Sequence, residues 1–223
     1  MLFRSTSEIV SGPLHGLKDG ADGGNGVFAY GTSTVFPNNS FDATNYWVDI
    51  AVAVGTTTFA GSIWNDATTP SVAAWDDSTA VTLGMKFQSD TNGFITGVRF
   101  YKGAENTSPH VGNLWTANGT LLASVTFANE TASGWQQASF STPVPIIAGT
   151  TYIVSYYTTV GHYAADPGYF AESEAVNGPL HGLQNDAAGG NGVFTYGPNP
   201  TFPANDFGAI NYWVDIIFSD QLA

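Results

Sequence analysis

The four histidines of this chain lie in short motifs and could act as metal ligands or as acid–base groups. His15 and His181 each lie in Gly-Pro-Leu-His-Gly-Leu, His110 precedes Val-Gly-Asn, and His162 lies in Gly-His-Tyr. Imidazole and carboxylate suit transition metals, so His162, Asp166 and His181 are a candidate metal site if the fold brings them together. Their spacing matches no common zinc motif, and a loop histidine often only supports a turn. Both interpretations remain open.

Hydrolytic chemistry would need His162 beside Asp166 and a hydroxyl group, as in a Ser–His–Asp site. The sequence has no Gly-x-Ser-x-Gly nucleophile motif. Its glutamates form no evident pair for glycoside hydrolysis, which uses two carboxyl groups. We therefore expect a protein that is not an enzyme, and we keep a hydrolase as the second alternative.

Short acidic clusters offer the oxygen ligands that calcium prefers. They comprise Asp76 with Asp77, Asp90 with Asn92, and Asp19 with Asp22 and Asn25. None has the spacing of an EF-hand, and Asp, Asn and Gly together are also ordinary turn residues. The sequence thus requires no cofactor but leaves a structural calcium ion as an open alternative.

Aromatic residues form 14% of the chain and could line a carbohydrate-binding surface. The candidate ligand-binding residues are Trp64, Trp75, Trp115, Trp135, His110, His162, Tyr163, Asp166 and His181. A carbohydrate-binding module requires some of these tryptophans to be exposed, whereas a structural module needs large aromatic rings to fill its core.

The charge balance excludes several classes of partner. Only 10% of the residues are charged, five are Lys or Arg, and the formal net charge is −13. We therefore expect no nucleic-acid partner and no attraction to anionic membranes. No apolar stretch is long enough for a secretory signal near residue 1 or for membrane insertion elsewhere. The absence of cysteine suits bacterial secreted modules that fold without disulfides.

Period-two alternation between turn clusters predicts β-strands along most of the chain. Leu83, Met85 and Phe87 should face the core, and Asn92-Gly93 should close a hairpin between residues 83–88 and 94–102. Two prolines within residues 142–149 predict an edge strand. In the closing strand, residues 211–218, one face should carry Tyr212, Val214, Ile216 and Phe218, and the other Trp213 and Asp215. The predicted fold is an all-β antiparallel sandwich, jelly-roll or immunoglobulin-like, with almost no helix.

A long internal repeat organises these strands. Residues 12–50 and 178–216 are identical at 26 of 39 positions, at a constant offset of 166 residues. Duplication at domain length indicates tandem modules. The repeat predicts a partial copy at residues 1–54, equivalent to the last third of a module, and a complete module at residues 55–223. We call residues 1–54 the first tail, residues 56–168 the body, and residues 169–219 the second tail.

One body can hold only one tail, so the first tail must hide its apolar strand elsewhere. The candidate assembly edge is Tyr46, Trp47, Val48 and Ile50. We expect this edge to pair with a sheet edge of its own module or of a neighbouring chain, which would give a strand-exchanged homo-oligomer. The repeated Gly-Gly-Asn-Gly run precedes a predicted strand rather than a helix, so we interpret it as a turn with positive φ angles and not as a phosphate loop.

Six segments of the complete module carry a family resemblance: 97–103 (GVRFYKG), 110–115 (HVGNLW), 134–136 (GWQ), 148–152 (AGTTY), 161–163 (GHY) and 211–216 (NYWVDI). Across residues 60–218 the chain resembles the bacterial module family called domain of unknown function 4082. The resemblance implies a β-sandwich and a cell-surface or secreted location, and no activity. We expect a non-catalytic module of a repetitive bacterial protein that acts in adhesion or as a spacer, with neighbouring modules and polysaccharide as partners. A carbohydrate-binding module that accompanies polysaccharide-degrading enzymes is the first alternative.

Overall fold

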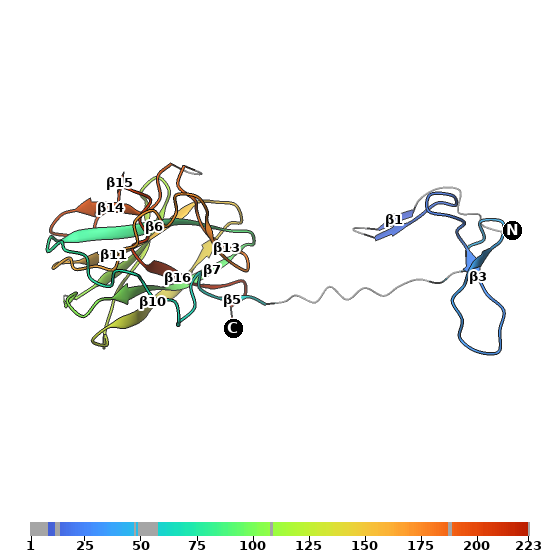
Figure 1. The fold of residues 1–223 in the computed structure, drawn as a ribbon, viewed down its shortest axis with the longest axis horizontal. Helices are drawn as coiled ribbons and strands as arrows, with labels where there is room; N and C mark the ends of the chain where they lie inside the picture. Colours follow the sequence, from blue (N-terminus) through green and yellow to red (C-terminus); the bar gives the residue numbers. More distant parts are fainter. Residues whose placement is uncertain are drawn as a thin grey trace. The chain divides into compact units, whose positions relative to one another are not determined.

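The computed structural model describes residues 9–11, 14–46, 48, 58–107, 109–186 and 189–222. It divides into two compact units, Met1–Thr56 and Thr57–Ala223, which we call unit 1 and unit 2. Within the described ranges every regular element is a β-strand and every strand pair is antiparallel (Figure 1). The predicted all-β sandwich is therefore confirmed.

Unit 2 consists of two packed sheets. The smaller sheet has the order β10 (Gly134–Ile146), β7 (Gly93–Lys102), β16 (Val214–Ser219) and β5 (Ala60–Gly61). The larger has the order β12 (Ala175–Asn177), β13 (Leu180–Gly182), β6 (Val81–Ser89), β11 (Tyr152–Thr158), β8 (Val111–Thr116) and β9 (Leu121–Thr126). In that sheet β14 (Val193–Tyr196) also pairs with β6, and β15 (Asn205–Asp206) pairs with β14.

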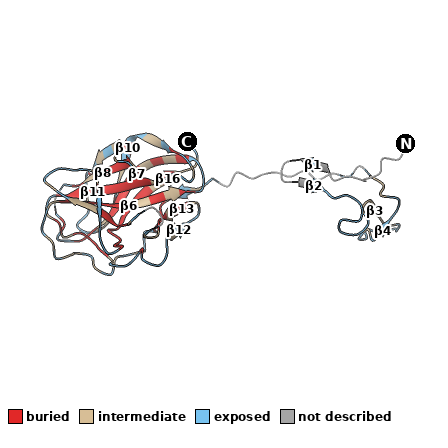
Figure 2. Cartoon of the chain, turned by 90° about the horizontal axis from the view of Figure 1, so that it is seen from above, coloured by how far each residue is buried: buried red, intermediate tan, exposed pale blue. Residues whose placement is uncertain are grey.

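The core lies between the two sheets, and the central strands β6, β7 and β11 are largely buried (Figure 2). Leu83, Met85 and Phe87 of β6 are buried as the alternation predicted. The segment that contains Pro143 and Pro145 belongs to β10, which is an edge strand of the smaller sheet. The sequence predicted this edge position, since proline has no N–H to donate to a second neighbouring strand.

The predicted hairpin at Asn92-Gly93 is wrong. β6 and β7 lie in different sheets, so residues 90–92 form an arch between the sheets. The arch bonds to other loops: Gly149 N–H donates to the Ser89 carbonyl at 2.8 Å, and Ala148 N–H donates to Asn92 Oδ1 at 2.9 Å. The loop before β11 therefore supplies the bonds that a hairpin would have made across its turn.

Both faces of the closing strand are buried: Val214, Ile216 and Phe218 lie in the core, and Trp213 and Asp215 lie buried on the opposite face. Residues 62–68 cover the outer face of the smaller sheet at this point, and the Asp215 carboxylate accepts the N–H groups of Ile63 and Trp64 at 3.1 Å each. This covering segment has almost no regular structure, so its position gives no periodic signal in the sequence.

Both ends of unit 2 meet at one pole. β5 pairs with β16 through Ala60 opposite Ser219 and Gly61 opposite Phe218. Phe59 N–H donates to Asp220 Oδ2 at 2.8 Å, and Asp220 N–H donates to the Phe59 carbonyl at 3.0 Å. We call this end the proximal pole. The opposite end is the distal pole, formed by loops 74–80, 103–110, 127–133 and 159–164.

Unit 1 contains two short strand pairs. β1 (Ile9–Ser11) pairs with β2 (Leu14–Gly16), and β3 (Val27–Phe28) pairs with β4 (Asn39–Ser40).

The meeting of the two ends can be tested by cross-linking, because the chain has no cysteine of its own. The double variant Ala60→Cys/Ser219→Cys should form a disulfide under mild oxidation, since directly opposed residues of an antiparallel pair have suitable Cα spacing. The oxidised form should be about 2–4 kcal/mol more stable to urea than the reduced form. The control Ala60→Cys/Ser133→Cys, with one residue at each pole, should stay reduced. Efficient cross-linking of the control, or none in the test variant, would contradict the strand pairing.

Candidate functional site

The distal pole gathers five of the polar residues singled out in the sequence. Asp76, Asp77, His110, His162 and Tyr163 all lie on its loops. The pole forms because β6 and β8 begin where β7 and β11 end, as the registers Thr158–Val81 and Tyr157–Val111 require. It lies opposite the proximal pole, where the two ends of unit 2 meet, and it is the candidate functional site.

Asp77 is the centre of an exposed part of this pole. Its carboxylate accepts the hydroxyls of Tyr196 at 2.7 Å and Tyr163 at 3.1 Å, and the N–H of Thr79 at 2.9 Å. Burial raises the pKa of Asp77, but these hydrogen bonds outweigh it and hold the pKa below its usual value. Tyr196 is 50% exposed, so an aromatic face and a fixed carboxylate lie together at the surface.

The Gly-His-Tyr motif forms the wall behind Asp77. Gly161 and His162 both have positive φ angles, of 63° and 48°. His162 N–H donates to the Asp77 carbonyl at 2.7 Å, and a Cβ on Gly161 would collide with that same carbonyl. The His162 ring lies 3.8 Å from the Glu105 carboxylate. A non-glycine residue held in the left-handed region at a surface site is the kind of strain that often accompanies function.

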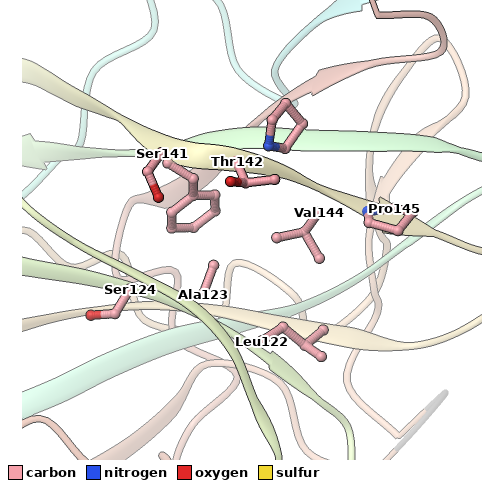
Figure 3. Close-up of a pocket in the computed structure, with 9 residues that line it drawn as sticks. Leu122, Ala123, Ser124, Ser141, Thr142, Val144 and Pro145 are labelled. Atoms are coloured by element: carbon pink, nitrogen blue, oxygen red, sulfur yellow. The ribbon is translucent and has the colours of Figure 1, made fainter.

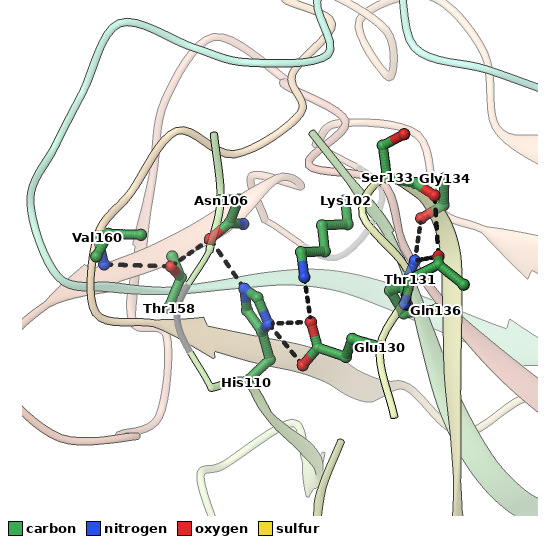
Figure 4. A network of polar contacts seen from close by, with 10 residues as sticks. All are labelled: Lys102, Asn106, His110, Glu130, Thr131, Ser133, Gly134, Gln136, Thr158 and Val160. Carbon is green, nitrogen blue, oxygen red and sulfur yellow. Dashed lines mark hydrogen bonds and ion pairs between the residues drawn. The ribbon is translucent and has the colours of Figure 1, made fainter. Parts of the chain in front are cut away.

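His110 lies beneath the surface in a buried polar network (Figure 4). Its Nδ1 lies 2.9 Å from both carboxylate oxygens of Glu130, and its Nε2 lies 2.8 Å from Asn106 Oδ1. Lys102 Nζ donates to Glu130 Oε2 at 2.8 Å. Burial lowers the pKa of His110, and the hydrogen bond to Glu130 offsets part of this effect. Since the ring is fully buried, His110 ties the loop that contains Asn106 to the loop that contains Glu130 rather than meeting a ligand.

The structure does not bring His162, Asp166 and His181 together. His181 lies on β13 opposite Gln88, toward the proximal pole, between Asp90 at 3.0 Å and Glu174 at 3.1 Å. Burial lowers the pKa of His181, but the two carboxylates outweigh it and raise the pKa above its usual value. Asp166 accepts Ser71 N–H at 2.9 Å, so it meets a hydroxyl-bearing residue but not the His162 ring that a hydrolase would need.

Three of the four predicted calcium ligands, Asp77, Asp90 and Asn92, are engaged in other bonds, and Asp76 is exposed. The carboxylate of Asp77 is held by tyrosines, that of Asp90 binds His181, and Asn92 Oδ1 accepts Ala148 N–H. In the described part of the chain, no three His, Asp or Glu side chains converge as metal ligands. A calcium site therefore remains a prediction. Likewise, the described residues contain no helix of the length and apolarity needed to cross a membrane.

The four candidate tryptophans do not form an exposed strip. Trp64 and Trp115 are buried, and Trp75 and Trp135 are partly buried against the core. The Trp135 ring stacks on Trp64 at 6.5 Å and carries the Arg99 guanidinium at 4.1 Å from its centroid. The Trp64 and Trp135 rings thus fill the space between the smaller sheet and its covering segment, whereas Trp115 packs on the larger sheet with Ile153 and Val193. This packing matches the structural alternative that the sequence left open.

Asp215 is an important residue whose role the sequence did not reveal. Its carboxylate accepts three backbone N–H groups, from Ile63, Trp64 and Ile216, and so fixes the covering segment to β16. Burial raises the pKa of Asp215 to about 6, although these bonds and Arg99 favour the charged form. The available signal was its place in the repeated Tyr-Trp-Val-Asp-Ile motif, since alternation alone does not show that this face of the strand is covered.

A shallow groove lies away from the distal pole, where the edge strands β9 and β10 face each other (Figure 3). It is lined by Leu122, Ala123, Ser124 and residues 140–145. No lining residue is titratable, and the prolines on its rim remove backbone donors, so the groove offers little chemistry.

The raised pKa of Asp215 predicts a pH dependence of stability. Between pH 4 and 6 the unfolded chain, with a pKa near 3.8, loses the Asp215 proton before the folded chain does. Stability from this group is thus fully present below pH 4 and falls by up to ~3 kcal/mol as the pH rises past 6. Asp215→Asn cannot titrate, so the difference in unfolding free energy between wild type and variant should change by this amount between pH 4 and 7. Urea unfolding measures it, with the exposed Asp76→Asn as control. A difference that is constant with pH would contradict the shift.

Comparison with known proteins identifies the module. A family model described as "Domain of unknown function (DUF4082)" matches residues 67–214, which is more than half of the chain. The search of curated proteins finds no match. The matched range runs from the covering segment through the body to the start of β16, and it includes the distal pole. The resemblance seen in the sequence is therefore confirmed, and the chain belongs to the DUF4082 family.

Proposed function

We propose that unit 2 is a non-catalytic module of a repetitive bacterial cell-surface or secreted protein, and that it acts in adhesion by presenting its distal pole. The observation that carries the proposal is the pairing of β5 with β16, through which the chain enters and leaves at one pole. Neighbouring strands lie about 5 Å apart, so such a module adds little length to an array. This geometry favours a displayed module over a spacer.

The non-catalytic part of the proposal rests on how the reactive side chains are used. His110, Glu130 and Lys102 bind one another below the surface, His181 lies between two carboxylates, and Asp215 holds backbone N–H groups. These groups are engaged in folding contacts. Exposed Glu105 and partly buried His162 remain, and they lie 3.8 Å from each other.

Polysaccharide is the partner class that the distal pole suits best. Tyr196 offers a half-exposed ring, and Asp77, bonded to its hydroxyl at 2.7 Å, offers oxygens that can accept from sugar hydroxyls. Aromatic rings with a polar edge are well suited to such mixed apolar and polar contact. The formal charge of −13 also argues against an anionic glycan, so we propose a neutral one.

A glycan array probed with the full chain tests this function. Wild type should bind a defined set of neutral glycans, and Tyr196→Ala should weaken that binding by about tenfold or more, as expected for loss of a central aromatic contact. The matched control is Tyr30→Ala, the same repeat position in unit 1, which is 93% exposed and should leave binding unchanged. Melting curves check that both variants fold. Absence of binding, equal loss in both variants, or hydrolysis of a bound glycan would contradict the proposal.

A further inference from the structure

We infer that the first tail is a docking element, and that its partner is a copy of the module body. The inference deepens the proposed role in a repetitive protein, on which it rests, by naming what covers the apolar face of unit 1. Residues 12–50 of the first tail are identical at 26 of 39 positions to residues 178–216, most of which belong to the second tail in unit 2.

The two tails fold locally in the same way. β1 pairs with β2 in the register Val10–His15, and β12 pairs with β13 in the register Val176–His181, which is the same register 166 residues later. The β3–β4 pair and the β14–β15 pair also share one register: Val27 lies opposite Ser40, and the equivalent Val193 lies opposite the equivalent Asp206. Positive φ angles also recur at this offset. They occur at residues 20 and 186, 23 and 189, 26 and 192, 42 and 208, and 43 and 209.

The glycine loop holds the same internal hydrogen bonds in both tails. Asn25 N–H donates to Asp19 Oδ1 at 2.7 Å, and Asn191 N–H donates to Asn185 Oδ1 at 3.0 Å. The amide of Asn25 donates to the Leu17 carbonyl, as that of Asn191 does to Leu183. The backbone of the first tail is therefore already shaped as the second tail is when docked.

In unit 2 this loop makes one further contact, with the edge of β6. Asn191 Oδ1 accepts Lys86 N–H at 2.8 Å, and Asn191 Nδ2 donates to the Lys86 carbonyl at 3.1 Å. Lys86 lies between the part of β6 that pairs with β14 and the part that pairs with β13. The Asn191 amide thus acts as one more backbone unit in the ladder, and Asn25 carries the same amide.

The side chains that dock in unit 2 are exposed in unit 1. Val193 is 3% exposed and Val27 is 46% exposed; Val214 is 0% exposed and Val48 is 86% exposed. Tyr212 is buried, whereas Tyr46 is 46% exposed. Trp47 and Ile50, also predicted for this edge, lie outside the described residues. Because the residue types are identical in the two tails, the surface that fits the first tail is the one that β6 and β7 present to the second.

A set of full-length variants tests the docking. Val193→Asp should weaken the second tail and leave the body open to the first. In this background Val27→Asp should raise the unfolding equilibrium constant of unit 2 by a further factor of about ten. In the wild-type background the same change should alter that constant less than about twofold. The effects of two substitutions depart from additivity in this way only when the two sites are coupled. The matched controls are Val10→Asp and Val176→Asp, at positions exposed in both units, and they should be silent in either background. Urea unfolding followed by tryptophan fluorescence gives the constants.

A silent Val27→Asp in both backgrounds would overturn the docking. If Val193→Asp does not fold, Val193→Ala and Val27→Ala repeat the cycle with milder changes. Sedimentation velocity over a concentration series distinguishes a body in the same molecule from one in a second copy, and coupling by either route supports the inference. Failure here leaves the glycan experiment on Tyr196 unaffected, so the two proposals fail separately.

Discussion

The docking of the second tail into the body is the interaction on which the rest of unit 2 depends. β16, the last strand, lies inside the smaller sheet between β7 and β5, and it fills the core with Val214, Ile216 and Phe218. On its other face Asp215 fixes the covering segment. β13 and β14 complete the larger sheet along β6. Without these strands both sheets would have open edges and the core would face water.

This closure also determines how the module presents itself. Because β16 ends beside β5, both ends of unit 2 lie at the proximal pole. The segments that carry Asp77, His162 and Tyr196 lie at the opposite, distal pole. The buried network of His110, Glu130 and Lys102 lies in the same pole and reaches Thr158, at the end of β11, through Asn106. The same long-range pairings that build the core thus also build and orient the candidate site.

Local patterns in the sequence were enough to predict the strands but not their partners. Alternation identified the inward side of β6 at Leu83, Met85 and Phe87, proline marked β10 as an edge, and the glycine run correctly indicated positive φ angles at Gly189 and Gly192. Pairing across long separations decided the rest. Asn92-Gly93 has the sequence of a hairpin turn, yet the loop before β11 binds it as an arch. Alternation placed Asp215 on the strand face opposite Val214, but it did not reveal the irregular segment that buries Asp215 there.

Amide hydrogen exchange on the full chain tests the central claim most directly, because the repeat supplies its own internal control. In a monomeric sample the single body already holds the second tail. The account then predicts strong protection at residues 193–196 of β14, which pair with β6, and little protection at the equivalent Val27 and Phe28 of β3, where an isolated two-stranded pair is marginal in water. The Lys86 N–H, bound by Asn191, should be protected with β14. Equal protection of the two copies in a monomeric sample would contradict the claim that docking on the body stabilises a tail.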